Sequence, residues 1–384
     1  MAAQGSTVTI KQPNETIQQT KIQSRIFYSN FGTGFSADGN RDENGVLSVS
    51  NKKLEASKYP EWLPTWDPKT YPKLESFEFV DKGLFADPEY KNIFPPEKRN
   101  SIEVNDISPL LGTEIRGIQL SELDDSGKND LARLVAERGV LVFRDQDLKD
   151  KGLEFNKKLG EYFGPLHIHQ TSGAPRDYPE FHIVYKKSDE PITKFQYNDR
   201  LSGKNWHSDV SYELHPPGIT FLVLLEGPKT GGDTLFADGV EAYERLSPHF
   251  KEFLKGVTCC HSGFTQANLS KEQGSYTRRE PVAHNHPIVR THPVTGKKSL
   301  YISGNFVTHI NGLKLEESDL ILNFLKNYIA SGYDFQIRAK WEEGTVAIWD
   351  NRRVIHAATF DWRGVTGRHL FRITPQAERP YDTD

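Results

Sequence analysis

The sequence predicts a mainly β fold with flanking helices, such as a β-sandwich, a barrel or a jelly roll. Many short runs rich in apolar and β-branched residues are separated by Gly, Pro, Asn and Asp, which is typical of strands joined by turns. The few segments with helical spacing do not alternate with these runs in the βαβ pattern of a doubly wound sheet. No Gly-x-Gly-x-x-Gly or Walker sequence is present, which disfavours nucleotide cofactors.

The composition is that of a folded globular protein. Its 384 residues suffice for one large domain or two modest ones. The net charge of -4 gives no electrostatic basis for binding nucleic acid or an anionic membrane, so we expect a small-molecule partner. The sequence contains neither an apolar run of about eighteen residues nor the apolar core of a signal peptide, which predicts a cytoplasmic location.

The first part of the chain, residues 1–75, is predicted to be a polar arm that packs on or extends from the main domain, residues 76–384. Up to about Pro60 the chain is polar and shows little periodicity. The segment YPEWLPTWDPKTYP then interleaves Trp62 and Trp66 with four prolines. We expect this segment to be extended and to anchor its aromatic rings on a neighbouring surface.

Regular structure is expected from about Ile102 onward. Residues 121–139 begin with cap-type residues, continue with apolar residues at helical spacing and end at a glycine, which predicts a helix. A buried strand over 140–146 and an amphipathic helix over 148–164, stopped by Gly-Pro, follow. The remaining segments are predicted as strands over 219–227, 233–238, 298–303, 335–341, 345–350, 353–360 and 369–375, and as helices over 240–256 and 315–331.

Two residues of the segment NWHSDVSYELHPPG suggest a metal site. If this segment is a strand, His207 and Asp209 point to the same face, because side chains two residues apart do so. A second histidine, His356 in WDNRRVIHAAT, lies in another predicted strand far downstream. A jelly roll returns a C-terminal strand beside an earlier one and would bring the three side chains together.

Two imidazoles and one carboxylate are typical Fe(II) ligands, and they leave three octahedral positions for a bidentate cosubstrate and oxygen. Zinc is the competing metal, but zinc hydrolysis also needs a positioned general base, and no His-Glu-x-x-His helix is present. The segment GRHLFRITP places Arg368 and Arg372 on one strand face, where guanidinium groups would bind an anionic cosubstrate. Pairing with surface acids is the alternative role of these arginines.

Other histidines and the two cysteines are given structural interpretations. His284, His286 and His292 in AHNHP and RTHP are expected to be solvated loop residues, with a lid over the site as the alternative. The adjacent Cys259 and Cys260 are interpreted as small buried or half-buried thiols in a reducing compartment rather than as a redox pair.

From Ile102 to Pro380 the chain resembles the Fe(II)/2-oxoglutarate-dependent dioxygenases of the taurine dioxygenase type, and most closely their fungal sulfonate dioxygenase members. The resemblance rests on FGPLHIHQTSG, WHSDVSYELHPPG, GGDTLFADGVEAYERLSP, HPIVRTHPVTGKKSLYI, WDNRRVIHAAT and RHLFRITPQAERP. YPEWLPTWDP is also similar to the fungal members. The resemblance implies a double-stranded β-helix (jelly roll, cupin-like) for the dioxygenase domain, residues 76–384.

The resemblance also implies the roles of individual residues. The catalytic iron would be held by His207, Asp209 and His356. The residues implied for 2-oxoglutarate are Thr234, Arg368 and Arg372, and those implied for the substrate sulfonate are His169 and Arg372. A strand would point His167 and His169 of the HIH sequence the same way, and His167 is interpreted as a packed core histidine.

The implied reaction consumes 2-oxoglutarate and O2 and hydroxylates an organosulfonate at the carbon bearing sulfur, which releases sulfite and an aldehyde together with succinate and CO2. Gly203 and Ser172 stand where the bacterial enzymes have Asn and Tyr, which leaves open whether taurine itself is the substrate. The alternatives are the same chemistry on a sulfate ester, an aryloxyalkanoate or a purine, and a non-catalytic ligand-binding protein of this fold. Self-association into a homo-oligomer is a further expectation, and neither nucleic acid nor membrane is expected as a partner.

Overall fold

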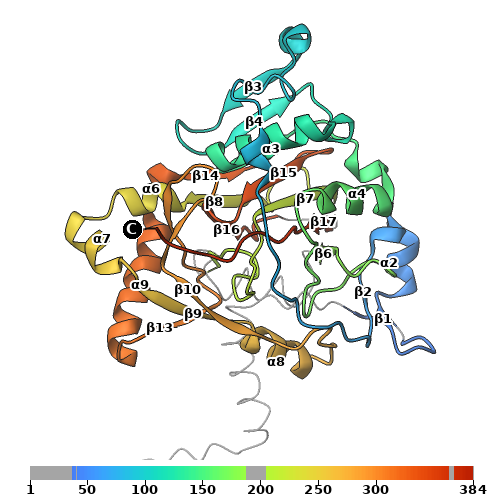
Figure 1. The fold of residues 1–384 in the computed structure, drawn as a ribbon. Helices are drawn as coiled ribbons and strands as arrows, with labels where there is room; N and C mark the ends of the chain where they lie inside the picture. The colour runs from blue at the N-terminus through green and yellow to red at the C-terminus, as the bar shows by residue number, and fades with distance from the viewer. Residues whose placement is uncertain (1–36, 40, 187–204, 363–366, 384) are drawn as a thin grey trace, which may run out of the picture.

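Two β-sheets lie at the centre of the structure (Figure 1). The computed structural model describes residues 37–39, 41–186, 205–362 and 367–383. The strands of the larger sheet are, in spatial order, β3 (Glu103–Asp106), β4 (Thr113–Arg116), β5 (Val140–Phe143), β15 (Val346–Asp350), β7 (Ile219–Glu226), β17 (Arg368–Ile373) and β6 (His182–Lys186). The strands of the smaller sheet are β14 (Gln336–Ala339), β8 (Thr234–Asp238) and β16 (Val354–Ala358). The predicted mainly β fold with flanking helices is confirmed.

The inner faces of these two sheets share one apolar cluster. Leu222, Trp349 and Leu370 from the larger sheet pack with Phe236 and Val354 from the smaller one. The Phe236 and Trp349 rings lie 5.5 Å apart. This arrangement of facing sheets is the basis of a jelly roll, and it buries every strand on which the candidate site residues lie.

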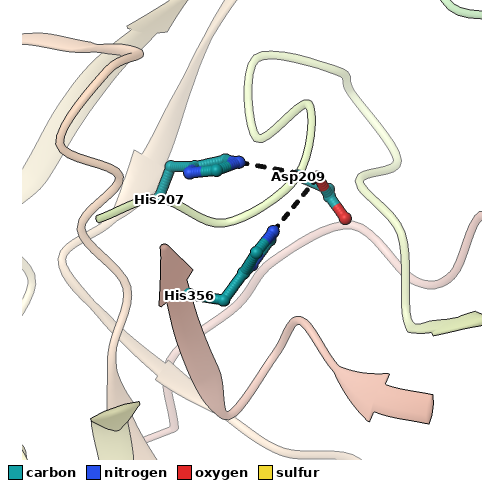
Figure 2. Close-up of side chains that lie close together, drawn as sticks. All are labelled: His207, Asp209 and His356. Atoms are coloured by element: carbon teal, nitrogen blue, oxygen red, sulfur yellow. Dashed lines mark ion pairs between the residues drawn. The ribbon is translucent and has the colours of Figure 1, made fainter. Parts of the chain in front are cut away.

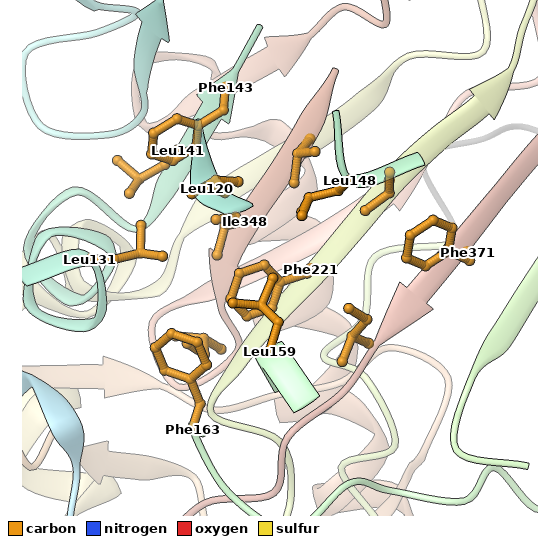
Figure 3. Close-up of a cluster of buried hydrophobic side chains, with 14 of the residues drawn as sticks. Leu120, Leu131, Leu141, Phe143, Leu148, Leu159, Phe163, Phe221, Ile348 and Phe371 are labelled. Atoms are coloured by element: carbon orange, nitrogen blue, oxygen red, sulfur yellow. The ribbon is translucent and has the colours of Figure 1, made fainter. Parts of the chain in front are cut away.

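The outer face of the larger sheet is covered by helices α3 (Asp125–Arg138) and α4 (Gly152–Glu161) (Figures 1 and 3). Alternate residues of β7, among them Phe221 and Val223, pack against this layer, while their neighbours in sequence face the inner cluster. Because both faces of β7 are covered, its sequence is a continuous apolar run and not an alternating one.

The predicted helix over 121–139 is shorter than expected at its start. Asp124 is the N-cap and accepts a hydrogen bond from the Gly127 N–H at 2.8 Å, so the helix proper begins at Asp125. Its C-cap, Gly139, has a φ of +73°, a left-handed conformation that glycine adopts without strain.

A third layer contains strands and helices that were only partly predicted. The predicted helix over 240–256 is two helices, α6 (Gly239–Glu244) and α7 (Pro248–Leu254), because Ser247 caps a new start with Pro248 at the first position. The predicted helix over 315–331 coincides with α9 (Leu315–Ser331). The sheet beside these helices consists of β10 (Ala283–Pro287), β9 (Thr258–Ser262) and β13 (Val307–Ile310).

The interpretation of three histidines as solvated loop residues was wrong. His286 lies on β10, is fully buried and contacts the Glu213 carbonyl oxygen through Nε2 at 2.9 Å. His292 is buried and pairs with Asp350 at 2.9 Å, and His284 contacts the Tyr212 carbonyl at 2.7 Å. Each of the three rings makes a polar contact inside the protein, which the polarity of the sequence alone does not predict.

The remaining elements are short. The strands are β1 (Leu47–Ser48), β2 (Thr65–Trp66), β11 (Val289–Thr291) and β12 (Lys298–Leu300), and the helices are α2 (Asn51–Ala56) and α8 (Phe264–Glu272). The 3-10 turns are Pro60–Trp62, Lys82–Phe85, Pro96–Ser101, Leu120–Glu122, Leu148–Asp150 and Tyr333–Phe335. Regular structure therefore begins well before Ile102, because the proline-rich segment folds onto the domain. Among the described residues no helix is both long and apolar enough to cross a bilayer.

The tryptophans of the proline-rich segment are buried anchors. Trp62 stacks on Phe371 of β17, with ring centroids 3.9 Å apart and planes 12° apart, and meets Phe181 edge-on at 5.2 Å. The Trp62 carbonyl oxygen also lies 3.1 Å from His369 Nε2. The segment thus covers the outer face of β17. A boundary between arm and domain at residue 75 stays a prediction.

We predict that Trp62→Ala lowers the free energy of unfolding by about 3–5 kcal/mol, because it removes a buried aromatic ring and leaves a cavity against Phe371. Urea denaturation followed by circular dichroism measures the change. Glu61→Ala, at an exposed neighbouring position, is the control and should be close to neutral. Equal stability of Trp62→Ala and the wild-type protein would show that this stacking is dispensable.

Candidate active site

The structure brings His207, Asp209 and His356 together (Figure 2). His207 and His356 form an antiparallel bridge, in which each backbone N–H donates to the carbonyl oxygen of the other at 2.9 Å. Their Nε2 atoms lie 3.8 Å and 3.7 Å from the same oxygen, Oδ1 of Asp209. Two imidazole nitrogens and a carboxylate oxygen therefore converge on one point.

The predicted strand through His207 and Asp209 was wrong. The side chains of His207, Asp209 and His356 nevertheless converge. His207 forms only the isolated bridge to His356, and Asp209 lies in the turn that follows. Val210 has a φ of +35°, and the Asp209 N–H donates to Asn351 Oδ1 at 3.2 Å. A turn held by Asn351, and not strand alternation, aims the carboxylate at the imidazoles.

The three side chains fit a metal ion. Their candidate ligand atoms all lie within 4.8 Å of one another, and no second cluster of this kind occurs in the part of the chain that the structure describes. His207 Nδ1 donates to the Asn205 carbonyl at 2.7 Å, which leaves Nε2 as the ligand atom. Asp209 Oδ2 is buried and has no hydrogen-bond partner among the described residues. An orphaned buried carboxylate oxygen is expected where a cation belongs.

The imidazoles are also in the charge state that a metal requires. Burial, and then the neighbouring His207, lower the pKa of His356 to about 3. Burial likewise lowers the pKa of His207, although the charge of Asp209 opposes this effect. Both rings are therefore neutral near pH 7, so metal binding need not displace a proton from either.

Arg368 and Thr234 face the same space between the two sheets as His356. Thr234 pairs with Ala358 across β8 and β16, so its side chain lies on the face that carries His356. Trp341 Nε1 donates to Thr234 Oγ1 at 3.2 Å, and its ring centroid lies 5.9 Å from the Arg368 guanidinium carbon. The threonine hydroxyl thus keeps its own hydrogen for another acceptor.

The guanidinium of Arg368 is a buried cation that no carboxylate within the described ranges pairs with. Burial lowers the pKa of Arg368 to about 10, while the charges of Asp233 and Asp361 oppose this shift. Those two carboxylates instead form ion pairs with Arg338, at 2.5 Å and 2.7 Å. A buried cation of this kind is suited to an anionic ligand.

The GGDT segment makes room for this cation. Gly231 and Gly232 have φ values of +82° and +70°. A Cβ on Gly232 would lie 3.2 Å from the Arg368 side chain, and one on Gly231 would lie 2.9 Å from the Trp362 backbone. Glycine is needed here both for the backbone conformation and for the close approach of Arg368.

A second group of polar side chains surrounds Arg372. Arg372 donates through Nη1 to Asp209 and through Nη2 to His182 Nδ1 at 3.0 Å. The His169 ring lies edge-on to His182, with centroids 4.8 Å apart. The Arg372 Nε atom is buried without a partner among the described residues. The structure thus brings His169 and Arg372 to the metal triad, together with His182, which the sequence analysis missed.

His169 is held in one tautomer. Its Nδ1 accepts hydrogen bonds from the backbone N–H groups of Thr171 at 3.2 Å and Ser172 at 3.1 Å. Burial, and then the charges of His182 and Arg372, hold the pKa of His169 well below its usual range. The ring is neutral with its hydrogen on Nε2, so it offers one hydrogen-bond donor.

His167 occupies the structural position predicted for it. It is buried and lies 2.9 Å from Glu213, which also pairs with Arg279 at 2.8 Å.

Burial raises the pKa of Cys259 to about 12, so its thiol is unreactive. Cys260 is half-buried. Gly203, where the chain departs from the bacterial enzymes, lies outside the described residues.

The comparisons with known proteins agree with this geometry. The family described as "Taurine catabolism dioxygenase TauD, TfdA family" matches residues 103–374. The chain is 49% identical over 370 residues to the alpha-ketoglutarate-dependent sulfonate dioxygenase of Saccharomyces cerevisiae, with 95% of this chain and 89% of that protein covered. It is 41% identical over 342 residues to the alpha-ketoglutarate-dependent dioxygenase cnsP of Penicillium expansum, with 88% and 91% covered.

A solved structure shares the fold. The taurine dioxygenase from Burkholderia xenovorans superposes with a TM-score of 0.61 at 29% identity, over 74% of this chain and 92% of that one. The jelly-roll prediction is therefore confirmed. From the matched length and the similarity of these relatives, this chain belongs to the taurine catabolism dioxygenase TauD, TfdA family.

Proposed function

We propose that this protein is an Fe(II)- and 2-oxoglutarate-dependent dioxygenase that hydroxylates an organosulfonate at the carbon bearing sulfur. The products are sulfite and an aldehyde from the sulfonate, and succinate and CO2 from 2-oxoglutarate and O2. One observation carries the proposal: Arg368 and Arg372 lie on the face of β17 that faces the space between the sheets, and Arg372 contacts Asp209 of the metal triad. One arginine is available for each of two anionic reactants.

The metal triad supports iron chemistry. His207, Asp209 and His356 would supply three ligands on one side of the metal and leave the opposite positions for 2-oxoglutarate and O2. Bound iron supplies the redox chemistry that couples oxidative decarboxylation of 2-oxoglutarate to hydroxylation of the substrate. The protein holds its ligands in place through Asn205 and Asn351, which bind His207 Nδ1 and the Asp209 N–H.

The residues around Arg368 suit the far carboxylate of 2-oxoglutarate. The Arg368 guanidinium offers parallel N–H donors to a carboxylate in a site lined by the Trp341 and Trp362 rings. Thr234 adds an O–H donor, because it accepts from Trp341 and does not use its own hydrogen in that contact. A role for Arg372 in binding 2-oxoglutarate as well stays a prediction.

The residues around Arg372 suit the sulfonate. Arg372 Nε and His169 Nε2 each carry a hydrogen for an incoming acceptor. The similar proteins support this substrate class, since one is a sulfonate dioxygenase and a structural neighbour is a taurine dioxygenase. Positioning the sulfonate beside the metal would place the carbon that bears it within reach of the reaction. A cytoplasmic location and self-association into a homo-oligomer stay predictions.

The function is tested by incubating the protein with Fe(II), 2-oxoglutarate and O2 and a panel of taurine, 2-hydroxyethanesulfonate, ethanesulfonate and hexanesulfonate. We predict that sulfite and succinate form in equal amounts with at least one of them. Sulfite is measured by a thiol-exchange assay and succinate by mass spectrometry. Succinate that forms only with a sulfate ester, an aryloxyalkanoate or a purine, and never with a sulfonate, would contradict the proposal.

For the iron ligands, we predict that His207→Ala abolishes turnover and the visible charge-transfer band that Fe(II) and 2-oxoglutarate produce under anaerobic conditions. The reason is the loss of one of three ligands, which weakens both the metal and its chelated cosubstrate. His309→Ala, at an exposed histidine on β13, is the control and should keep both signals. A normal band in His207→Ala would reject the ligand assignment.

We predict that Arg368 and Arg372 bind different reactants. Arg368→Met should raise the KM for 2-oxoglutarate by about tenfold or more, and Arg372→Met should raise the KM for the sulfonate by a similar factor, since each loses charge-assisted hydrogen bonds. Steady-state kinetics with each reactant varied in turn measures both constants. The two variants serve as controls for each other, and an identical pattern in both would contradict the division of roles.

A further inference from the structure

His182 lies directly opposite Arg372 where β6 pairs with β17. Its Nδ1 is 3.0 Å from Arg372 Nη2, and its Nε2 is 3.4 Å from Ser172 Oγ. The ring also meets His169 edge-on, with centroids 4.8 Å apart. His182 therefore contacts the arginine and one histidine assigned to the sulfonate, as well as the serine where the sequence departs from the bacterial enzymes.

The partners of His182 assign its tautomer. A guanidinium can only donate, so Nδ1 must accept the hydrogen bond from Arg372. Burial, and then the charge of Arg372, hold the pKa of His182 well below its usual range, so the ring is neutral. Its hydrogen then resides on Nε2 and points to Ser172 Oγ, which keeps its own hydrogen for a further acceptor.

His182 differs from the buried histidines that have structural roles. His167 and His292 each lie 2.9 Å from a carboxylate, of Glu213 and Asp350, and these contacts neutralise charge within the fold. His182 instead accepts from a cation and has no carboxylate partner among the described residues. A neutral acceptor fixes the direction of a guanidinium without cancelling its charge.

We propose that His182 is a positioning residue for the sulfonate: it orients Arg372 and Ser172 without adding a second negative charge beside that of Asp209 on the Arg372 guanidinium. The inference rests on the proposed function of Arg372. With His182 in place, the donors left for the sulfonate are Arg372 Nε, Ser172 Oγ and His169 Nε2. Arg372 already pairs with Asp209, so a second carboxylate at position 182 would compete with a singly charged sulfonate for this guanidinium.

Three substitutions separate the orientation of Arg372 from its charge. His182→Asn keeps a neutral acceptor near the position of Nδ1, His182→Leu removes the acceptor at similar size, and His182→Asp supplies an acceptor that carries a negative charge. The probe is taurine, or the member of the sulfonate panel that yields most sulfite. Its binding to the anaerobic protein loaded with Fe(II) and 2-oxoglutarate is measured by calorimetry, so no turnover is needed.

We predict that His182→Asn binds the probe nearly as the wild-type protein does. His182→Leu should bind it about tenfold more weakly or worse, the factor for a lost hydrogen bond to a charged group. His182→Asp should also bind about tenfold more weakly or worse, because its charge offsets that of Arg372. The charge-transfer band should be unchanged in all three, since His182 itself contacts Ser172, His169 and Arg372 and none of the three iron ligands.

Several outcomes would overturn the inference. Equal affinity of His182→Leu and the wild-type protein would show that His182 does not position Arg372, and equal affinity of His182→Asp and His182→Asn would show that its neutrality is irrelevant. Loss of the band in every variant would indicate a general structural role. A wild-type protein that binds no sulfonate of the panel would instead contradict the proposed function itself, and the inference with it.

Discussion

The alternation of side chains along β17 is the constraint on which the rest of the site depends. Arg368, Leu370 and Arg372 face the space between the sheets, while Phe371 and Ile373 face the outer core. A shift of the strand by one residue would put both arginines into the apolar layer under the helices. Pairing with β7 on one side and β6 on the other fixes the register. The same pairing that builds the core therefore aims the cations at the metal triad.

The charges inside the protein divide into two kinds. Most buried cations are neutralised within the fold, such as Arg352 and Arg353, which pair with Asp350 and Asp238. The Arg368 guanidinium has no such carboxylate among the described residues, whereas Arg372 pairs with Asp209 of the metal triad. Because an unpaired buried charge is costly, its retention is physically reasonable where a ligand supplies the counter-charge.

Several elements could be predicted from the sequence because their signals are local. The helix over 315–331 has a sustained apolar period, and the apolar run of β7 is unmistakable. The sheet of β9, β10 and β13 was missed, because TCCHS and AHNHP lack apolar alternation and bury polar groups by hydrogen bonding. The split of the predicted helix over 240–256 could have been read from the Ser-Pro pair at its middle.

For the candidate site, the sequence predicts the types of residue but not the contacts that hold them in position. The two-histidine, one-carboxylate set and the arginine pair stand out in the sequence, even though a turn and not a strand presents Asp209. The contact between His182 and Arg372 depends on the register of two strands that are far apart in the chain, which no local pattern encodes. The hydrogen bond from Trp341 to Thr234 depends in the same way on the pairing of β14 with β8.

The packing of Trp62 on Phe371 joins the N-terminal segment to the strand that carries the arginines. The opposite faces of β17 are thus occupied by the proline-rich segment and by the site, and the thickness of one strand separates them. Detachment of the proline-rich segment would expose the apolar outer face of β17 and destabilise this strand. We therefore expect proteolytic cleavage in the segment around Trp62 to reduce both solubility and catalysis.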